Sequence, residues 1–273
     1  MRYFSLTLQL ITLVLILVAL PQRLLAQAAP SDTSAIAVVR THDAVIALGV
    51  SAVTLGVMAF DERVALNLQR SSVQSNGSFK GAANVFNAIG FPGSIVMIAG
   101  TYFYGLGEHS RPIASLGMHT GEAFVLGGVL AEGLQMSIGR ARPQRDIRNA
   151  YDFKPGKGFR DDNYTSFPST HVTVAFAAAT AASREVTRSW PLAAKYVTPV
   201  TYSLASLAGV SRMYKNKHWA SDVVAAAGLG TYSGILFDRY NQGHPDNLFD
   251  RVFLPSSIAP QGSGIAVEWS FAR

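Results

Sequence analysis

The chain has no cysteine, so disulfide bonds and thiol chemistry contribute neither stability nor catalysis. It also lacks the Cys/His spacing of a zinc module and the glycine-rich loop of a nucleoside triphosphatase. Only 15% of the residues are charged, and no basic tract with interleaved aromatic residues occurs. We therefore expect no nucleic-acid partner. The mild net charge of +6 suits attraction of a phosphorylated substrate.

Strict alternation of apolar and polar residues, the signal of a strand, is nearly absent. Instead, the chain has apolar segments of helical length, and these predict an all-α fold, a single bundle of about six helices. The sequence Gly-Phe-Pro-Gly at 90–93 predicts a break within one of them. A short extended segment is expected near the C-terminus, where 265–271 alternates. The expected helices are 44–60, 82–106, 112–138, 172–182, 191–210 and 223–240.

The expected organisation has four parts. Residues 1–28 read as a secretory signal, with Arg2, an apolar run and small residues at the end, or alternatively as an uncleaved anchor. A lead-in at 29–43, a helical domain at 44–240 and a tail at 241–273 follow.

Both readings of the N-terminus predict export, with a periplasmic location. The segments 172–182 and 223–237 fall short of the roughly 20 apolar residues that cross a bilayer. Glu122 and Glu132 would also be costly in lipid. We therefore expect a soluble or peripheral bundle, with an integral membrane protein as the alternative because 44–60 and 82–106 are strongly apolar.

The stretch 211–222 combines a guanidinium, an imidazole and a carboxylate. Arg212 has a planar fork of donors that suits a phosphate or a carboxylate. His218 and Asp222 are four residues apart, so on a helix the carboxylate would orient the imidazole. The apolar run from Val223 predicts that His218 lies in the first turn of a helix, where anions are favoured. An ordinary solvated loop ahead of a core helix is the alternative.

Two further stretches carry matching chemistry. Arg142 with Pro143 closes one helical segment, and the sequence Pro-Ser-Thr-His at 168–171 opens another. Proline followed by hydroxyl residues is typical of a helix N-terminus, where free N–H groups can bind an anion. We expect Arg142, His171, Arg212 and His218 to surround one anionic centre.

With these motifs in this order, the chain resembles the type 2 phosphatidic acid phosphatase family, over roughly residues 80 to 240. That family includes bacterial acid phosphatases, lipid phosphatases and vanadium haloperoxidases. Its pattern is Lys-x6-Arg-Pro, then Pro-Ser-Gly-His, then Ser-Arg-x5-His-x3-Asp. The third part is complete here, the second has Thr170 in place of glycine, and the first has Gln135 in place of lysine. The matching residues are Arg142, Pro143, Pro168, Ser169, His171, Ser211, Arg212, His218 and Asp222.

The resemblance implies hydrolysis of phosphate monoesters, lipid phosphates or lipid diphosphates through a phosphohistidine. His218, oriented by Asp222, would attack phosphorus, and His171 would protonate the leaving oxygen. The resemblance implies no metal and no other cofactor. The implied phosphate-binding positions are Gln135, Arg142, Ser169, Thr170 and Arg212.

Gln135 keeps two alternatives open. It carries no charge, so one phosphate-neutralising cation is missing unless Arg140, Lys154 or Lys157 replaces it. The alternatives are a vanadium-dependent haloperoxidase, with vanadate as its cofactor, and a catalytically weakened binding or envelope protein. Substrate identity, whether a lipid, a nucleotide or a sugar phosphate, and oligomeric state stay open.

Overall fold

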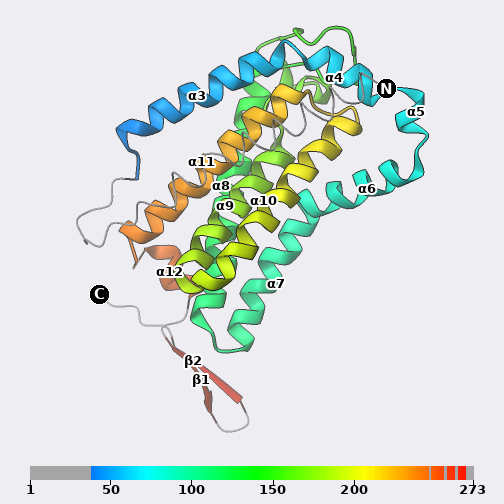
Figure 1. Ribbon diagram of the computed structural model, residues 1–273. Helices are drawn as coiled ribbons and strands as arrows, with labels where there is room; N and C mark the ends of the chain where they lie inside the picture. Colours follow the sequence, from blue (N-terminus) through cyan, green and yellow to red (C-terminus); the bar gives the residue numbers. More distant parts are fainter. Residues whose placement is uncertain (1–37, 246, 255–256, 262–263, 269–273) are drawn as a thin grey trace.

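The computed structural model describes residues 38–245, 247–254, 257–261 and 264–268, and Figure 1 shows the arrangement. The expected signal at 1–28 and most of the lead-in lie outside the described residues. The all-α prediction is confirmed. The described part of the chain contains more helices than the six expected, because several short ones occupy segments that were expected to be loops or tail.

Four long helices form the bundle: α8 (Arg111–Ile138), α9 (Thr170–Ser189), α10 (Pro191–Tyr214) and α11 (Ala220–Gly243). Helix α9 packs against the other three and is largely buried. Its contact with α11 is close at Gly230, where a Cβ atom would lie 2.2 Å from the Thr173 carbonyl oxygen. The missing side chain of this glycine therefore lets α11 approach α9 closely in the centre of the bundle.

Three outer helices cover this bundle. Helix α3 (Thr41–Met58) packs on α11, α6 (Gly77–Ala88) on α10, and α7 (Ser94–Gly107) on α8. The predicted break at Pro92 is confirmed as a five-residue π-helical turn, Ile89–Gly93, that joins α6 to α7.

Short helices account for the main differences from the expected fold. Residues 61–80 were expected to be polar connecting material, but they contain α4 (Asp61–Leu68), α5 (Ser71–Gln74) and the start of α6. Helix α4 is amphipathic, since Asp61, Val64, Ala65 and Leu68 are buried at helical spacing.

The C-terminal tail also differs from expectation. It contains helix α12 (Leu248–Phe253), whose first turn is capped by the Asn247 side chain, which accepts a hydrogen bond from the Asp250 backbone N–H. Strands β1 (Ser257–Gln261) and β2 (Gly264–Glu268) follow as an antiparallel pair. The expected extended segment at 265–271 overlaps β2 as far as Glu268, and its last three residues lie outside the described part of the chain.

Four helical segments are long and apolar enough to cross a membrane: Thr41–Met58, Gly77–Gly107, Arg111–Ile138 and Ala220–Gly243. On the first three of these segments apolar side chains face outward, and Leu48, Val96 and Val129 are each about two-thirds exposed, whereas most of Ala220–Gly243 is buried inside the bundle. Apolar surface on this scale is typical of lipid contact. The structure therefore favours membrane association over the soluble bundle that we expected. We expected the apolar segment 223–237 to be too short to cross a bilayer, but helix α11 extends beyond it at both ends, from Ala220 to Gly243.

Candidate active site

Three sequence motifs meet at the end of the bundle that lies opposite α12 (Figure 1). Backbone hydrogen bonds join them. The Gln144 N–H donates to the Asn216 carbonyl at 3.1 Å, and the Ser169 N–H donates to the Asp222 carbonyl at 3.4 Å. The expected convergence of the three motifs is therefore present in the backbone itself.

The first motif is positioned by the end of helix α8. Gly139 has a φ of 63°, the left-handed conformation that ends many helices. A Cβ atom there would lie 1.9 Å from the Lys154 carbonyl oxygen, so only glycine fits. The turn directs the following residue, Arg140, into the interior, where its side chain is fully buried.

Arg140 connects two carboxylates that come from distant parts of the chain. Its guanidinium donates to Asp222 Oδ1 at 2.5 Å and to Asp61 Oδ2 at 2.8 Å. It also donates to the Ser221 hydroxyl and to the Ala150 carbonyl, both at 2.7 Å. All three charged side chains are completely buried. The cation between two anions compensates charge that would otherwise be costly to bury.

Asp222 is held from its other side as well. Its Oδ2 atom accepts hydrogen bonds from the Ser166 hydroxyl at 2.5 Å and from the Trp219 backbone N–H at 2.8 Å. The carboxylate therefore has partners on both oxygens before any contact with His218 is considered. Asp222 is the centre of a fixed polar network.

His218 is oriented by a backbone carbonyl. Its Nδ1 atom lies 2.7 Å from the Ser166 carbonyl oxygen but 4.0 Å from Asp222 Oδ2. Because a carbonyl only accepts, Nδ1 must carry the proton, and the neutral ring then presents an unprotonated Nε2. The expectation of a direct Asp222–His218 hydrogen bond is replaced by contacts that both make with Ser166.

The helical position expected for His218 was wrong. Helix α11 begins at Ala220, so His218 lies in the loop before it, and the i, i+4 geometry of a helix does not apply. By contrast, His171 lies in the first turn of α9 and Arg212 in the last turn of α10, as expected.

The electrostatics of the two histidines show that they share one site with two arginines. Burial lowers the pKa of His171 to about 4, with further lowering by Arg212 and Arg142. Burial and the same two guanidinium groups hold the pKa of His218 well below its ordinary value. Both imidazoles are therefore neutral at physiological pH when no anion is bound.

The guanidinium groups are themselves close together. The pKa of Arg212 is lowered to about 10 by burial and by Arg142. Arg212 is held by Asn87 Oδ1 of helix α6 at 2.8 Å, and Arg142 donates to the Thr165 hydroxyl at 2.8 Å. Among the described residues, neither arginine forms an ion pair with a carboxylate, so the charge of both stays available to an anion.

Several buried polar atoms at this end have no hydrogen-bond partner among the described residues: Ser169 Oγ, Thr170 Oγ1 and Arg212 Nε. Ser169 precedes the first residue of α9, yet its hydroxyl does not cap the helix. Buried polar groups normally find partners. Two hydroxyls, a guanidinium N–H and a helix N-terminus are together suited to the oxygens of a tetrahedral anion.

Gln135 has a structural contact. Its side-chain amide donates to the Pro168 carbonyl oxygen at 2.5 Å, and the side chain is buried. The contact supports the loop that carries Ser169. The phosphate-binding position assigned to Gln135 stays a prediction, but its amide N–H is already engaged in this conformation.

The three cations considered as replacements for the missing lysine have other contacts. Arg140 is bound to Asp61 and Asp222, as described above. Lys154 and Lys157 place their ammonium groups 5.3 and 4.0 Å from the centre of the Tyr164 ring. A different lysine approaches the site, Lys217, whose pKa is lowered by burial and then by Arg142 and Arg212.

Sequence reasoning missed four residues of this site. Asp61 and Asn87 come from α4 and α6, outside every motif, and no local pattern marks them. Ser166 lies three residues before Ser169 in the second motif. The Phe91 ring lies 4.9 Å from the His171 ring, at the predicted helix break. Two signals could have been used: the helix break at Pro92 points to Phe91, and the buried acid of an amphipathic helix points to Asp61.

Comparisons with known proteins agree with the motifs. Residues 116–244 match the model of the PAP2 superfamily, a narrower span than the 80 to 240 expected. Over 112 residues the chain is 33% identical to the lipid A 1-phosphatase of Porphyromonas gingivalis. That match covers 41% of this chain and 20% of the relative, so it spans about a fifth of the relative's length.

One solved structure is similar in fold. It is a transmembrane PAP2 type phosphatidylglycerolphosphate phosphatase from Bacillus subtilis, with a TM-score of 0.49 and 22% identity. The similarity covers 75% of this chain and 94% of that structure.

Proposed function

We propose that this protein is a membrane-associated phosphatase that hydrolyses lipid phosphates or diphosphates, and the match of residues 116–244 to the model of the PAP2 superfamily supports the proposal. The observation that carries the proposal is the orientation of His218. Its Nδ1 atom is 2.7 Å from the Ser166 carbonyl, which fixes Nε2 as the free nitrogen in a site with two guanidinium groups. This is the arrangement that a nucleophilic histidine needs.

In the first step, His218 Nε2 attacks phosphorus and the bond from phosphorus to the leaving oxygen breaks. His171 gives its proton to that oxygen, so the alcohol or phosphate departs with one fewer negative charge. The bound phosphoryl group carries negative charge that raises the pKa of His171 from about 4, which allows it to hold this proton. Arg142, Arg212 and Ser169 stabilise the non-bridging oxygens.

In the second step, water attacks the phosphohistidine and His171 takes a proton from it. The bond from phosphorus to Nε2 breaks, its electron pair returns to His218, and inorganic phosphate leaves. Two guanidinium groups supply the positive charge that a metal supplies in other phosphatases. We therefore propose a metal-independent reaction with no cofactor.

Two observations support a lipid substrate. The outward apolar faces of Thr41–Met58, Gly77–Gly107 and Arg111–Ile138 would hold the chain in a bilayer, with the site at one end of the bundle. The relative from Porphyromonas gingivalis is named for a lipid substrate. We propose export with the site facing the periplasm, which protease accessibility from outside the inner membrane would test.

The test is phosphate release by the full chain purified in detergent, in the presence of EDTA. We expect turnover of phosphatidic acid or phosphatidylglycerol phosphate micelles that exceeds turnover of p-nitrophenyl phosphate. His218→Ala should lower the rate by about a thousand-fold or more, since it removes the nucleophile. Glu132→Gln, an exposed change on α8, should retain the wild-type rate.

Four results would contradict the proposal. Wild-type protein that releases no phosphate would favour a binding protein. Bromide oxidation with vanadate and peroxide would favour a haloperoxidase. Turnover unchanged in His218→Ala would show that another group is the nucleophile, and failure to trap an acid-labile phosphoenzyme with a labelled substrate would argue against the covalent step.

A further inference from the structure

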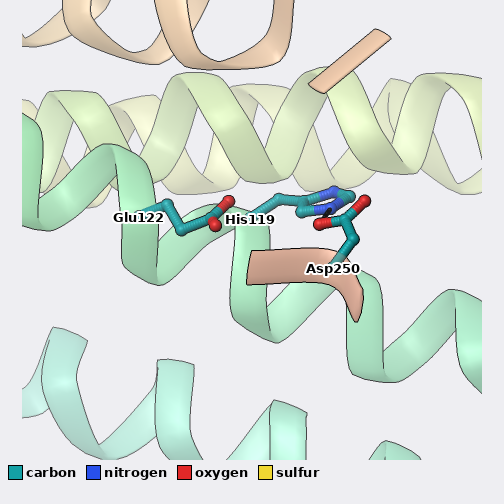
Figure 2. A group of neighbouring side chains, drawn as sticks. All are labelled: His119, Glu122 and Asp250. Atoms are coloured by element: carbon teal, nitrogen blue, oxygen red, sulfur yellow. Dashed lines mark hydrogen bonds and ion pairs between the residues drawn. The ribbon is translucent and has the colours of Figure 1, made fainter. Parts of the chain in front are cut away.

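A second histidine, which is partly buried, has a different environment near helix α12. His119 and Glu122 lie one turn apart on α8, and Asp250 reaches them from α12 (Figure 2). One nitrogen or oxygen from each of these three side chains lies within 4.8 Å of the others. His119 Nε2 is 3.3 Å from Asp250 Oδ1. Elements that are far apart in the sequence thus bring an imidazole and two carboxylates together.

A further carboxylate orients the imidazole. His119 Nδ1 lies 3.2 Å from Glu185 Oε2 of α9, and Glu185 has its own cation, because Arg188 donates to it at 2.5 Å. With Nδ1 donating to Glu185, the Nε2 lone pair is directed to Asp250. A histidine that binds a metal through one nitrogen usually donates its other N–H to a carboxylate in this way.

The separation of Nε2 and Asp250 Oδ1 also fits a shared cation. Two ligands of a tetrahedral ion, with bonds of about 2.0–2.1 Å, lie roughly 3.3–3.4 Å apart. Asp250 is buried, and its position is fixed by Asn247, which caps α12. The pair therefore needs no rearrangement to act as two ligands.

Glu122 supplies an independent observation. Its Oε2 atom accepts from the Asn241 side chain at 3.0 Å, which orients the carboxylate. Its Oε1 atom is buried and has no hydrogen-bond partner among the described residues. A buried carboxylate oxygen without a partner is costly, and a cation beside His119 and Asp250 would supply one.

We propose that His119, Glu122 and Asp250 bind a divalent transition-metal ion, such as Zn²⁺, that fastens α12 to the bundle. An imidazole with two carboxylates suits zinc, whereas Mg²⁺ and Ca²⁺ prefer oxygen ligands alone. His119 precedes Gln135 by 16 residues on α8, a distance of roughly 24 Å at 1.5 Å per residue. The ion is therefore structural and does not act in phosphate hydrolysis.

The test uses the full chain in detergent, stripped with EDTA and then equilibrated with Zn²⁺ or Mg²⁺. We expect one bound zinc per chain by mass spectrometry of the metal, and a rise in melting temperature with zinc but not with magnesium. Asp250→Asn and Glu122→Gln should each lose both effects, while Glu132→Gln on the same helix should keep them. Glu185→Gln should weaken zinc binding by roughly 10–100-fold, because it removes only the orienting carboxylate.

The opposing structure is a protonated His119 that bridges Glu185 and Asp250 with no metal. It predicts no bound zinc in the wild type, or equal zinc binding in wild type, Asp250→Asn and Glu122→Gln, and either result overturns the proposal. If a variant fails to fold, the d–d absorption spectrum of Co²⁺ added to the wild type decides between the two structures. Co²⁺ bound by nitrogen and oxygen ligands has a different spectrum from Co²⁺ without this coordination. None of these readouts uses phosphatase activity.

Discussion

The buried His218, just before α11, and the partly buried His119, in the first half of α8, lie toward opposite ends of the same bundle and show how surroundings decide what an imidazole can bind. His218 faces two guanidinium groups, and a carbonyl holds its Nδ1 atom. His119 lies between Glu185 and Asp250, with Glu122 close by. One environment is prepared for an anion and the other for a cation.

The comparison also shows where each site keeps its opposite charges. At the active-site end the acids Asp61 and Asp222 are neutralised by Arg140, away from the position that we assign to phosphate. Arg142 and Arg212 are left for the substrate. Near α12 the arrangement is reversed, since Arg188 neutralises Glu185 while Glu122 and Asp250 stay available to a cation.

The largest expected effect comes from removing the cation between the two acids. Arg140→Gln leaves Asp61 and Asp222 buried without compensation, and loss of one partner of a buried pair typically costs about 3–5 kcal/mol. We expect a large fall in melting temperature and loss of phosphatase activity. Arg145→Gln is the control, because its ion pair with Asp152 is partly exposed and worth about 1 kcal/mol or less. Equal stability of the two variants would contradict this role.

A smaller effect is expected at Ser166, whose hydroxyl and carbonyl serve different partners. Ser166→Ala removes the hydrogen bond to Asp222 but keeps the carbonyl that holds His218. Asp222 Oδ2 keeps the Trp219 N–H but loses its other donor, and a hydrogen bond to a charged group is worth about 1.5–3 kcal/mol, so we expect kcat to fall by roughly 10–100-fold with little change in KM. Ser137→Ala, an exposed serine on α8, is the control. A change confined to KM would assign Ser166 to substrate binding instead.

The third prediction concerns the proton on His171. Arg212→Gln removes a cation that disfavours the imidazolium, so the pKa of His171 should rise from about 4 toward its ordinary value. NMR titration of labelled histidine in detergent micelles measures this directly, and Arg145→Gln serves as the reference. An unchanged pKa would mean that Arg212 does not contribute, and that burial and Arg142 set the protonation of His171.

The smallest expected effect is at Lys217, which lies near both arginines but donates to the partly exposed Gln144. Lys217→Gln should raise KM a few-fold at low ionic strength, with kcat nearly unchanged. The reason is that the Lys217 ammonium group attracts the substrate without contacting the leaving group. Added salt should reduce the difference from wild type. A salt-independent loss of kcat would place Lys217 in the reaction itself.

Sequence reasoning predicted the features of this molecule that depend on continuous sequence patterns. Apolar periodicity predicted the long helices. The order of the motifs predicted that Arg142, His171, Arg212 and His218 lie together, at what is one end of the bundle. It failed where the determinant is a contact between distant segments. The partner of His218 could not be read from the i, i+4 spacing to Asp222, because the helix begins at Ala220 and Ser166 occupies the intervening position.

The same limit explains two other differences. Gln135 looked like a lost phosphate contact, and only the position of Pro168 shows that its amide supports a loop. The prediction about the membrane rested on the lengths of apolar segments, whereas the outward direction of Leu48 and Val96 depends on how the helices pack. Packing direction is a property of the folded chain, so a single sequence contains little information about it.

Asp61 has a practical consequence for the boundaries of this protein. It precedes residue 116, where similarity to the superfamily begins, yet it accepts hydrogen bonds from Arg140 and from Ser221 inside the matched segment. An expression fragment trimmed to 116–244 would therefore retain every motif residue while losing an anion that holds them in place. The buried network around Arg140 therefore extends beyond the segment that matches the superfamily.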